Sequence, residues 1–259
     1  MNNILKIALI QYDIEWESTK NNLKKIEKMI DNAALNSYLI ILPEMFNTGF
    51  SMKPSKIAET MHGETLRWMI ETASKYQSII AGSVAIEDNG QYFNRLLTVY
   101  PNGNIEQYDK RHLFRMSGEE KVYFAGNKQV IVNINGWQCA LFVCYDIRFP
   151  VWTLNQNNYD LALYVANWPV SRIDVWQTLL KARALENQCY VAGINRIGKS
   201  EEAEYNGHSL IFDFKGAIIA SLPENEEGII KTELSINKLN DFRKKFPVWK
   251  DADKLTISY

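Results

Sequence analysis

The sequence predicts an α/β fold in which mixed β-sheets lie between layers of helices. Three observations favour it: strand and helix patterns alternate through the first third of the chain, β-rich segments joined by turns follow, and no linker or repeat interrupts them. The chain has 259 residues, 46% of them hydrophobic, and can bury a sizeable core without disulfides or metals. We therefore expect residues 1–259 to form a single domain.

The first third of the chain alternates strand and helix patterns. Its strands are β-rich or continuously apolar, and its helices repeat apolar residues at intervals of three and four. These elements are a strand at 4–11, a helix at 18–36 behind a possible Ser18 cap, a strand at 37–43 and a helix at 64–76. The second strand ends abruptly at Pro43, so it delivers Glu44 to the edge of a sheet.

Strands dominate the rest of the chain. Turn residues such as Asn135 and Gly136 separate β-rich runs, as they do in hairpins. The predicted strands are 79–86, 93–100, 105–108, 130–134, 137–144, 161–166 and 189–194, with a helix at 176–187 and closing hairpins over 209–213, 217–222 and 228–234. Ligand sites in such folds gather beyond strand ends, which directs attention to Glu44, Cys144 and Asn167.

Charge and hydropathy exclude several classes of protein. Lys and Arg number 29 against 30 Asp and Glu, a formal net charge of −1, so no basic field attracts nucleic acid. No apolar run approaches the roughly 20 residues that cross a bilayer. The N-terminal apolar run is interrupted by Lys6 and lacks a cleavage pattern. We expect a cytoplasmic protein that binds neither nucleic acid nor membrane.

The three cysteines are an odd number without a Cys-x-x-Cys pair, which fits neither a disulfide framework nor a tetrahedral zinc site. Cys144 ends an apolar strand and precedes a tight polar segment closed by Pro150, which is the context of a nucleophile elbow. The alternative for Cys144 is inert packing, and packing is the interpretation we keep for Cys139 and Cys189.

An attacking thiol needs a base, and the residues alone leave its identity open. A Cys–His dyad is possible with one of the three histidines, which are His62, His112 and His208. Glu44 and Lys110 offer another arrangement, in which a carboxylate takes the thiol proton and an ammonium holds a developing oxyanion. Taken singly, either could also be an ordinary solvated charge.

Three segments of the chain, in this order, resemble the signature segments of the nitrilase superfamily of carbon–nitrogen hydrolases. They are Leu-Pro-Glu-Met-Phe at 42–46, Tyr-Asp-Lys-Arg-His-Leu-Phe at 108–114 and Val-Cys-Tyr-Asp-Ile-Arg-Phe-Pro at 143–150. The resemblance extends to 7–11, 166–169, 182–187 and 195–198, and so covers nearly the whole chain. It implies a four-layer α-β-β-α sandwich, a homodimer and chemistry that needs no metal or organic cofactor.

The resemblance also implies a catalytic triad of Glu44, Lys110 and Cys144. A second glutamate, which orients the lysine, is implied between the last two, and we assign it to Glu119 with Glu120 as the alternative. In the implied mechanism Glu44 takes the thiol proton, and Lys110 with the backbone N–H of Tyr145 stabilises the oxyanion. Water then releases the acid from a thioester.

Within the superfamily, segments 109–116 and 144–152 look most like omega-amidases, which act on 2-oxo dicarboxylic acid monoamides such as 2-oxoglutaramate or 2-oxosuccinamate. Arg148 is the candidate for binding the substrate carboxylate; the alternative is a structural ion pair with Glu186 or Asp146. The aromatic residues expected to wall the pocket, each of which could equally be ordinary core, are Trp168, Phe46, Tyr145 and Phe114.

Other functions remain as alternatives. A nitrilase or an N-carbamoyl amino acid amidohydrolase could use the same triad, because these enzymes differ in pocket shape. Segment 193–200 matches the phosphate-binding pattern G-x-x-x-x-G-K-[ST], but the acidic residues after it disfavour the helix that such a loop requires. A catalytically inactive scaffold or a thiol redox protein is the remaining class.

Overall fold

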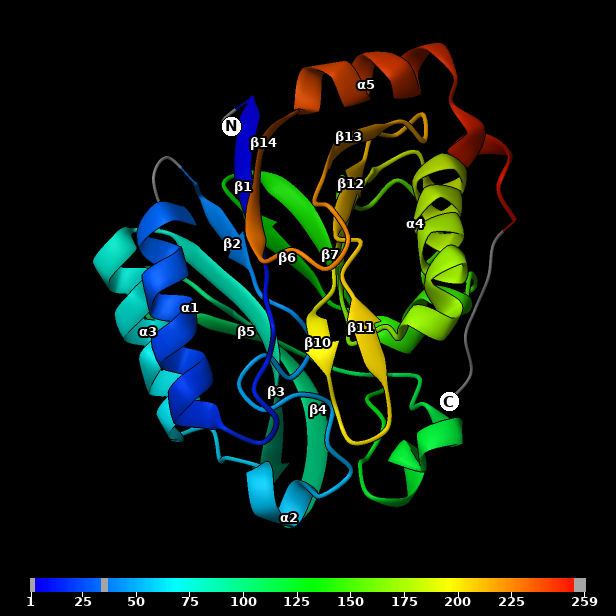
Figure 1. The fold of residues 1–259 in the computed structure, drawn as a ribbon. Coiled ribbons are helices and arrows are strands. Elements are labelled where there is room, and N and C mark those ends of the chain that lie inside the picture. Colours follow the sequence, from blue (N-terminus) through cyan, green and yellow to red (C-terminus); the bar gives the residue numbers. More distant parts are fainter. Residues whose placement is uncertain (1–2, 34–36, 254–259) are drawn as a thin grey trace.

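The computed structural model describes residues 3–33 and 37–253, and within them two six-stranded mixed sheets face each other (Figure 1). The first sheet consists, in spatial order, of β14 (Gly228–Ser235), β1 (Ile4–Gln11), β2 (Leu39–Ile41), β3 (Ile79–Asp88), β4 (Gln91–Val99) and β5 (Ile105–Asp109). The second consists of β13 (Ile218–Ser221), β12 (Leu210–Phe212), β9 (Tyr190–Ile194), β8 (Leu161–Val165), β7 (Trp137–Val143) and β6 (Ile131–Ile134).

Helices cover the outer face of each sheet. Helices α1 (Thr19–Ala33) and α3 (Glu64–Tyr76) lie side by side on the first sheet, against β1 and β3 (Figure 1). Helix α4 (Ile173–Asn187) packs on β9 and β12 of the second sheet. The layers are therefore α-β-β-α, and the predicted fold class is confirmed.

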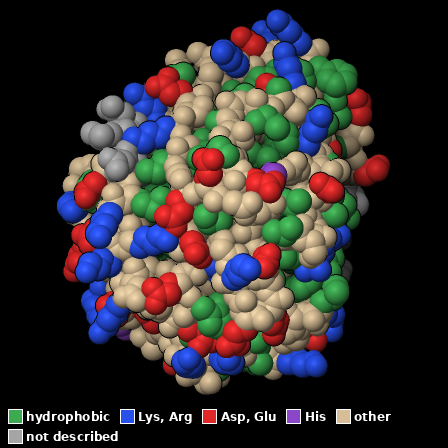
Figure 2. Space-filling view, in the orientation of Figure 1, with side chains coloured by type: hydrophobic (Ala, Val, Ile, Leu, Met, Phe, Trp, Pro, Cys, Tyr) green, Lys and Arg blue, Asp and Glu red, His purple; other side chains and the backbone are tan. Residues whose placement is uncertain are grey.

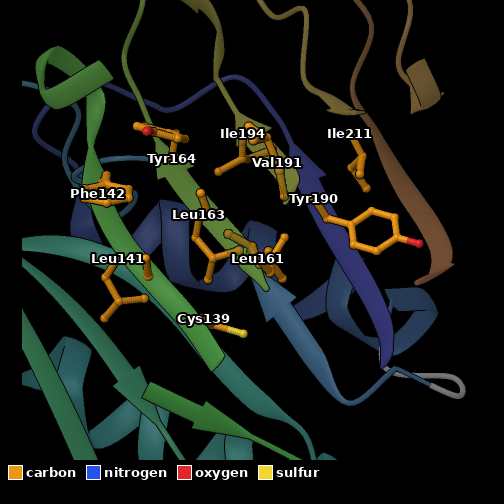
Figure 3. Packing of buried hydrophobic residues seen from close by; sticks show 14 of the residues in the cluster. Cys139, Leu141, Phe142, Leu161, Leu163, Tyr164, Tyr190, Val191, Ile194 and Ile211 are labelled. Carbon is orange, nitrogen blue, oxygen red and sulfur yellow. The ribbon is translucent and has the colours of Figure 1, made fainter. Parts of the chain in front are cut away.

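The central strands of the second sheet are buried along their whole length. Strands β7, β8 and β9 run parallel, and every residue of β8 and β9 is buried, as continuous apolar runs require. Figure 3 shows their side chains filling the core beside Cys139. Phe142 and Tyr164 are neighbours across β7 and β8, and their rings stack with centroids 5.0 Å apart. This packing fixes the strand that carries Cys144.

The predicted strands and helices are present to within a few residues at each end, apart from the end of the helix predicted at 18–36, where 34–36 lie outside the described residues. The closing hairpins are partly wrong: β12 and β13 pair, but β14 crosses to the first sheet and pairs antiparallel with β1. This pairing joins residues 217 to 231 positions apart.

The basic tail contains a helix that the sequence pattern did not predict, α5 (Ile236–Lys245). Its inner face buries Ile236 and Leu239, while Arg243 reaches Asp160 at 2.9 Å. The Ser235 side chain accepts a hydrogen bond from the backbone N–H of Lys238 at 3.4 Å and caps the helix. A short helix, α2 (Pro54–Ile57), was also not predicted.

The segment that matches a phosphate-binding loop has the wrong structure for one. Strand β9 is followed by a two-stranded hairpin, β10 (Ile197–Lys199) and β11 (Glu204–Asn206). The segment directly after Ser200 is therefore a turn and a strand, and not the helix that a phosphate-binding loop requires. A Cβ on Gly198 would lie 1.9 Å from the Asp13 carboxylate, so this glycine is needed for close packing rather than for phosphate. The interpretation of this segment as a P-loop is therefore wrong.

The surface carries charges of both signs. Figure 2 shows Lys and Arg interspersed with Asp and Glu over the face drawn, in keeping with the net charge of −1. Among the described residues, no helix combines the length and the apolar character needed to span a bilayer.

Candidate active site

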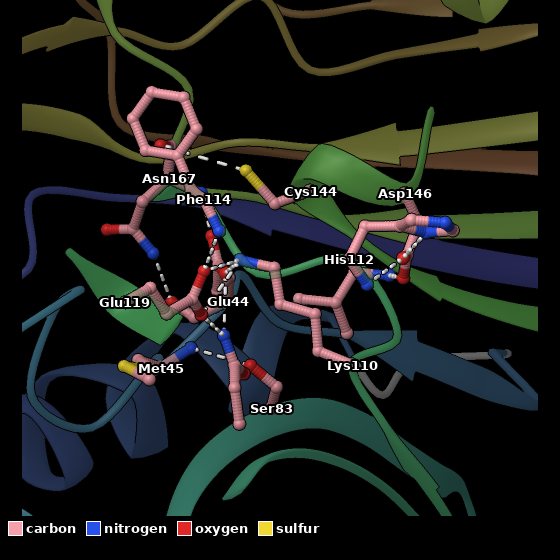
Figure 4. Close-up of polar contacts among 12 residues, drawn as sticks. Glu44, Met45, Ser83, Lys110, His112, Phe114, Glu119, Cys144, Asp146 and Asn167 are labelled. Atoms are coloured by element: carbon pink, nitrogen blue, oxygen red, sulfur yellow. Dashed lines mark hydrogen bonds and ion pairs between the residues drawn. The ribbon is translucent and has the colours of Figure 1, made fainter. Parts of the chain in front are cut away.

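Polar residues that follow four strands meet at one edge of the two sheets (Figure 4). They are Glu44 after β2, Lys110 directly after β5, Cys144 directly after β7 and Asn167 after β8. Parallel strands place their carboxyl ends at a common edge, where ligands bind in α/β folds. The structure thus brings together the side chains of the predicted triad, which lie far apart in the sequence.

Lys110 lies fully buried between two carboxylates. Its Nζ is 2.9 Å from Oε1 of Glu44, and 3.0 and 2.9 Å from Oε1 and Oε2 of Glu119. Glu44 and Glu119 are also fully buried. An ammonium has three donor protons, so it can donate one hydrogen bond to Glu44, one to Glu119 and one to a ligand.

The two glutamates differ in how many of their acceptor positions are filled. A carboxylate offers about four lone-pair positions. The carboxylate of Glu119 accepts hydrogen bonds from Lys110, from Asn94 Nδ2 at 3.4 Å and from the Phe114 backbone N–H at 2.6 Å, which occupy its lone-pair positions. Glu44 Oε1 accepts from Lys110 and from Asn94 Nδ2 at 2.7 Å, whereas Oε2 accepts one hydrogen bond from the described residues, that of the Asn167 N–H at 2.8 Å. One position on Glu44 Oε2 is therefore left for a transferable proton.

The backbone adopts a left-handed conformation at two points of the site. Cys144 has φ 46° and is the first residue of a short 3-10 helix (Cys144–Arg148), which confirms the expected sharp bend after the strand. Met45 has φ 40°, and its N–H donates to the Ser83 hydroxyl at 2.9 Å. Left-handed backbone at non-glycine residues is costly and is held in place by surrounding contacts.

The thiol of Cys144 is half-buried beside these charges, and its Sγ is 4.0 Å from the Asn167 carbonyl oxygen. Burial raises the pKa of this thiol well above its usual value; the Glu44 carboxylate raises it further, and the Lys110 ammonium lowers it. Burial also raises the pKa of Glu119, against the opposing effect of Lys110. The resting thiol therefore keeps its proton at neutral pH, and its attack requires a base.

A third buried carboxylate, Asp146, connects the Lys110 and Cys144 segments. Its Oδ2 accepts from the Tyr108 hydroxyl at 2.7 Å and from the Val143 N–H at 3.0 Å. Its Oδ1 accepts from the His112 N–H at 2.9 Å and lies 2.8 Å from His112 Nδ1. One side chain thus joins the residues that flank Lys110 to those that flank Cys144.

A pocket of about 270 Å³ opens above Cys144 and Lys110. Four of the predicted pocket residues line it: Tyr145, Arg148, Trp168 and Phe114. The Arg148 guanidinium carbon lies 5.5 Å from the centre of the Trp168 ring. Its alternative partners are engaged elsewhere, since Glu186 pairs with Arg183 and Asp146 forms the contacts above.

Phe46 was predicted to wall the pocket, and that prediction is wrong. Its side chain is fully buried in the core between the first sheet and its helices, against Gly82 and 6.0 Å from the Trp68 ring. The left-handed turn at Met45 directs Phe46 back under the sheet. Phe50 lines the pocket instead, with its ring centre 4.8 Å from Lys110 Nζ.

The residues offered as alternatives lie elsewhere. Glu119 contacts Lys110, whereas the structure gives Glu120 no such contact. None of the described histidines lines the pocket: His112 stacks on Phe149 with ring centroids 3.6 Å apart, and His208 contacts Gln177. Cys139 and Cys189 are fully buried in the core, as expected. Over 3–33 and 37–253, no group of His, Cys, Asp and Glu is arranged to hold a metal ion.

Sequence patterns missed several residues of the site. Asn94 lies fully buried within β4 and contacts both glutamates, and Arg172 lines the pocket at the start of α4. Strand β4 also contains Gln91, Arg95 and Thr98, so the sequence offered no distinctive signal for Asn94. For Arg172 the sequence gave only its position after the Asn-Trp-Pro segment at 167–169.

Comparison with known proteins agrees with this geometry. A family model described as carbon-nitrogen hydrolase matches residues 6–244. The chain is 44% identical to an omega-amidase of Escherichia coli over 98% of both chains, and 33% identical to a 2-oxoglutaramate amidase of Bacillus subtilis over 96% of this chain and 97% of that one. A solved CN-hydrolase superfamily protein from Xanthomonas campestris superposes with a TM-score of 0.96, at 37% identity and full coverage of both chains.

The fold and these relatives therefore define the class of enzyme, a carbon–nitrogen hydrolase that acts on amides. The chain belongs to the carbon–nitrogen hydrolase family.

Proposed function

We propose that this enzyme is an omega-amidase. It hydrolyses the terminal amide of a small 2-oxo dicarboxylic acid monoamide, 2-oxoglutaramate or 2-oxosuccinamate, to the acid and ammonia. The observation that carries the proposal is the Lys110 ammonium, held at 2.9 Å from Glu44 and from Glu119 beside the Cys144 thiol. The relatives named omega-amidase and 2-oxoglutaramate amidase support the substrate class.

Acylation begins when Glu44 accepts the Cys144 proton and the sulfur attacks the amide carbon. The free position on Glu44 Oε2 supports this role, and the filled acceptor positions of Glu119 support a role in orienting Lys110. The remaining Lys110 proton and the Tyr145 backbone N–H stabilise the oxyanion. Glu44 then gives its proton to the leaving nitrogen, so ammonia departs and a thioester remains.

Deacylation uses the same base. Glu44 accepts a proton from water, which attacks the thioester carbon, and the proton returns to the Cys144 sulfur as the carboxylic acid leaves. The overall balance is one amide and one water to one acid and one ammonia. Neither step draws on a metal or an organic cofactor.

The pocket supports a small anionic substrate. Its volume of about 270 Å³ lies below the range of ~300–1,000 Å³ typical of drug-sized ligands. Arg148 would bind the substrate carboxylate with its planar fork, while Trp168, Tyr145 and Phe114 wall the chain of the substrate.

The same proposal includes a cytoplasmic homodimer in which residues 1–259 form one hydrolase domain. Exposed apolar side chains on and beside α4 support an interface between two copies: Leu185, Phe246, Val248 and Trp249. Light scattering of the purified protein tests the dimer directly.

The decisive experiment is ammonia release from a panel of 2-oxo acid monoamides, simple amides, nitriles and N-carbamoyl amino acids. We expect the 2-oxo acid monoamides to give the highest kcat/KM and Cys144→Ala to abolish turnover. Cys139→Ala is the matched control, since it removes a thiol of β7, the strand that leads to Cys144, and this thiol lies outside the pocket. Activity confined to nitriles or carbamoyl compounds would replace the omega-amidase proposal with one of those functions.

A further inference from the structure

Two arginines line the pocket, and the mechanism above uses only one of them. Arg172 ends a short 3-10 helix (Val170–Arg172) that leads into α4. Its guanidinium carbon lies 5.1 Å from the centre of the Phe114 ring, as that of Arg148 lies 5.5 Å from Trp168. Each cation therefore rests on an aromatic wall of the same pocket.

Neither guanidinium is neutralised by a carboxylate of the protein, within the part of the chain that the structure describes. The other pocket cations differ: Lys110 contacts two glutamates, and Lys53 pairs with Glu201 at 3.1 Å. Glu202, also at the pocket, is exposed to solvent. The uncompensated positive charge of the pocket is thus concentrated on its two arginines.

Trp168 contacts both arginines, one through its side chain and the other through its backbone. Its ring lies under Arg148, and its indole Nε1–H donates to the Arg172 backbone oxygen at 2.7 Å. Trp168 is itself only 2% exposed, and its backbone N–H donates to Asn195 Oδ1 at 2.7 Å. A buried residue that supports the Arg148 guanidinium and the Arg172 backbone reduces the ordering that a ligand must impose on binding.

We propose that Arg172 is a specificity-determining residue that recognises the 2-oxo acid end of the substrate jointly with Arg148. This inference rests on the proposed function and deepens it. A 2-oxo acid presents three oxygens, and one guanidinium fork satisfies only the two of the carboxylate. Arg172 supplies the donor for the 2-oxo oxygen, while the amide at the other end of the substrate lies at Cys144.

The same charge rejects 2-amino acid amides. Glutamine differs from 2-oxoglutaramate in carrying an ammonium where the oxo oxygen stands. A second guanidinium at that position attracts the oxygen and repels the ammonium, and specificity often depends on such a repulsive element. Arg172 therefore separates a 2-oxo acid amide from the amino acid amide of equal length.

The test compares wild type with Arg172→Met on 2-oxoglutaramate, glutamine and propionamide, an uncharged amide. Among residues 3–33 and 37–253 the Arg172 guanidinium forms no ion pair or hydrogen bond and lies over the Phe114 ring, so the variant should fold. We expect KM for 2-oxoglutaramate to rise about 10- to 100-fold, the range for a lost hydrogen bond to a charged group, with little change in kcat. Kinetics on propionamide should stay the same, and the preference for 2-oxoglutaramate over glutamine should fall.

Two further variants sharpen the result. Arg172→Lys keeps the charge but not the fork, so it should restore discrimination against glutamine more fully than affinity for 2-oxoglutaramate. Arg115→Met removes an exposed arginine next to Phe114 but outside the pocket, and should behave as wild type. Equal losses on propionamide and 2-oxoglutaramate in Arg172→Met would indicate a structural role and overturn the inference, as would unchanged kinetics.

A binding measurement separates failure of this inference from failure of the proposed function. 2-Oxopentanoate carries the same acid end without the amide, and calorimetry gives its Kd for wild type and for Arg172→Met. Weaker binding by about tenfold or more in the variant supports the inference even if wild type fails to hydrolyse 2-oxoglutaramate. Equal Kd values reject it even if wild type hydrolyses 2-oxoglutaramate well.

Discussion

Two buried carboxylate clusters flank Cys144, and they use their oxygen atoms differently. In the Asp146 cluster, made of Asp146, Tyr108 and His112, both carboxylate oxygens receive two contacts each. In the Lys110 cluster, made of Lys110, Glu44 and Glu119, one oxygen of Glu44 accepts a single hydrogen bond. A filled carboxylate holds chain segments in place, whereas an incompletely filled one beside a thiol can move a proton.

The largest expected effect separates the two clusters by activity. Glu44→Gln removes the base while keeping its shape, so kcat/KM for the amide should fall about 10²–10⁴-fold in a protein that remains folded by circular dichroism. The pKa of the Cys144 thiol should also fall, because Glu44 raises it, and an ultraviolet titration of the thiolate measures that change. Glu120→Gln is the control. A thiol pKa that stays the same would place Glu44 outside the proton-transfer path.

The second prediction concerns stability. Lys110→Met leaves Glu44 and Glu119 buried without their counter-ion, and should lower the free energy of unfolding by about 3–5 kcal/mol at neutral pH. Burial raises the pKa of Glu119, and without the ammonium nothing opposes that effect, so its folded-state pKa exceeds the unfolded value of about 4.3. The loss should therefore be small in acid and grow as pH rises from the unfolded-state pKa through the folded-state pKa of Glu119. Urea unfolding across that range checks this, and a deficit that does not depend on pH would contradict it.

The third and smallest effect belongs to the Asp146 cluster. Asp146→Asn loses one acceptor and the charge, so stability should fall by about 1–3 kcal/mol and kcat by about tenfold through misalignment. Unlike Glu44→Gln, this change should leave the pKa of the Cys144 thiol unchanged. Tyr108→Phe removes a single donor to Asp146 and serves as the milder comparison, at about 1 kcal/mol. If Asp146→Asn shifts the thiol titration as Glu44→Gln does, the two clusters are not functionally distinct.

The sequence predicted the triad positions because each follows a recognisable strand within a signature segment. Apolar runs end at Pro43 and at Cys144, and these local patterns survive folding unchanged. The prediction for Phe46 failed because nothing in the sequence shows that Met45, a residue that rarely adopts positive φ, does so here. The positive φ at Met45, held by hydrogen bonds from Met45 and Phe46 to Ser83, accompanies the burial of the Phe46 ring in the core.

The remaining features depend on contacts between distant segments. Pairing of β14 with β1 and the docking of α5 through Arg243 onto Asp160 have no local signature. Asn94 and Arg172 are single polar residues whose importance depends on which side chains the two sheets place next to them. Patterns of period two or 3.6 identify elements and their faces, but they do not identify neighbours across sheets.

The left-handed turns at Met45 and Cys144 have a practical consequence for anyone who wants a more heat-resistant catalyst. Each left-handed residue costs about 1–2 kcal/mol of folding free energy, so a screen for stability would select substitutions that remove this conformation. Gains obtained there would come from releasing the bends that aim the base and the nucleophile. A thermostabilised variant should therefore be sought through substitutions remote from both bends, and every improved melting temperature should be checked against turnover.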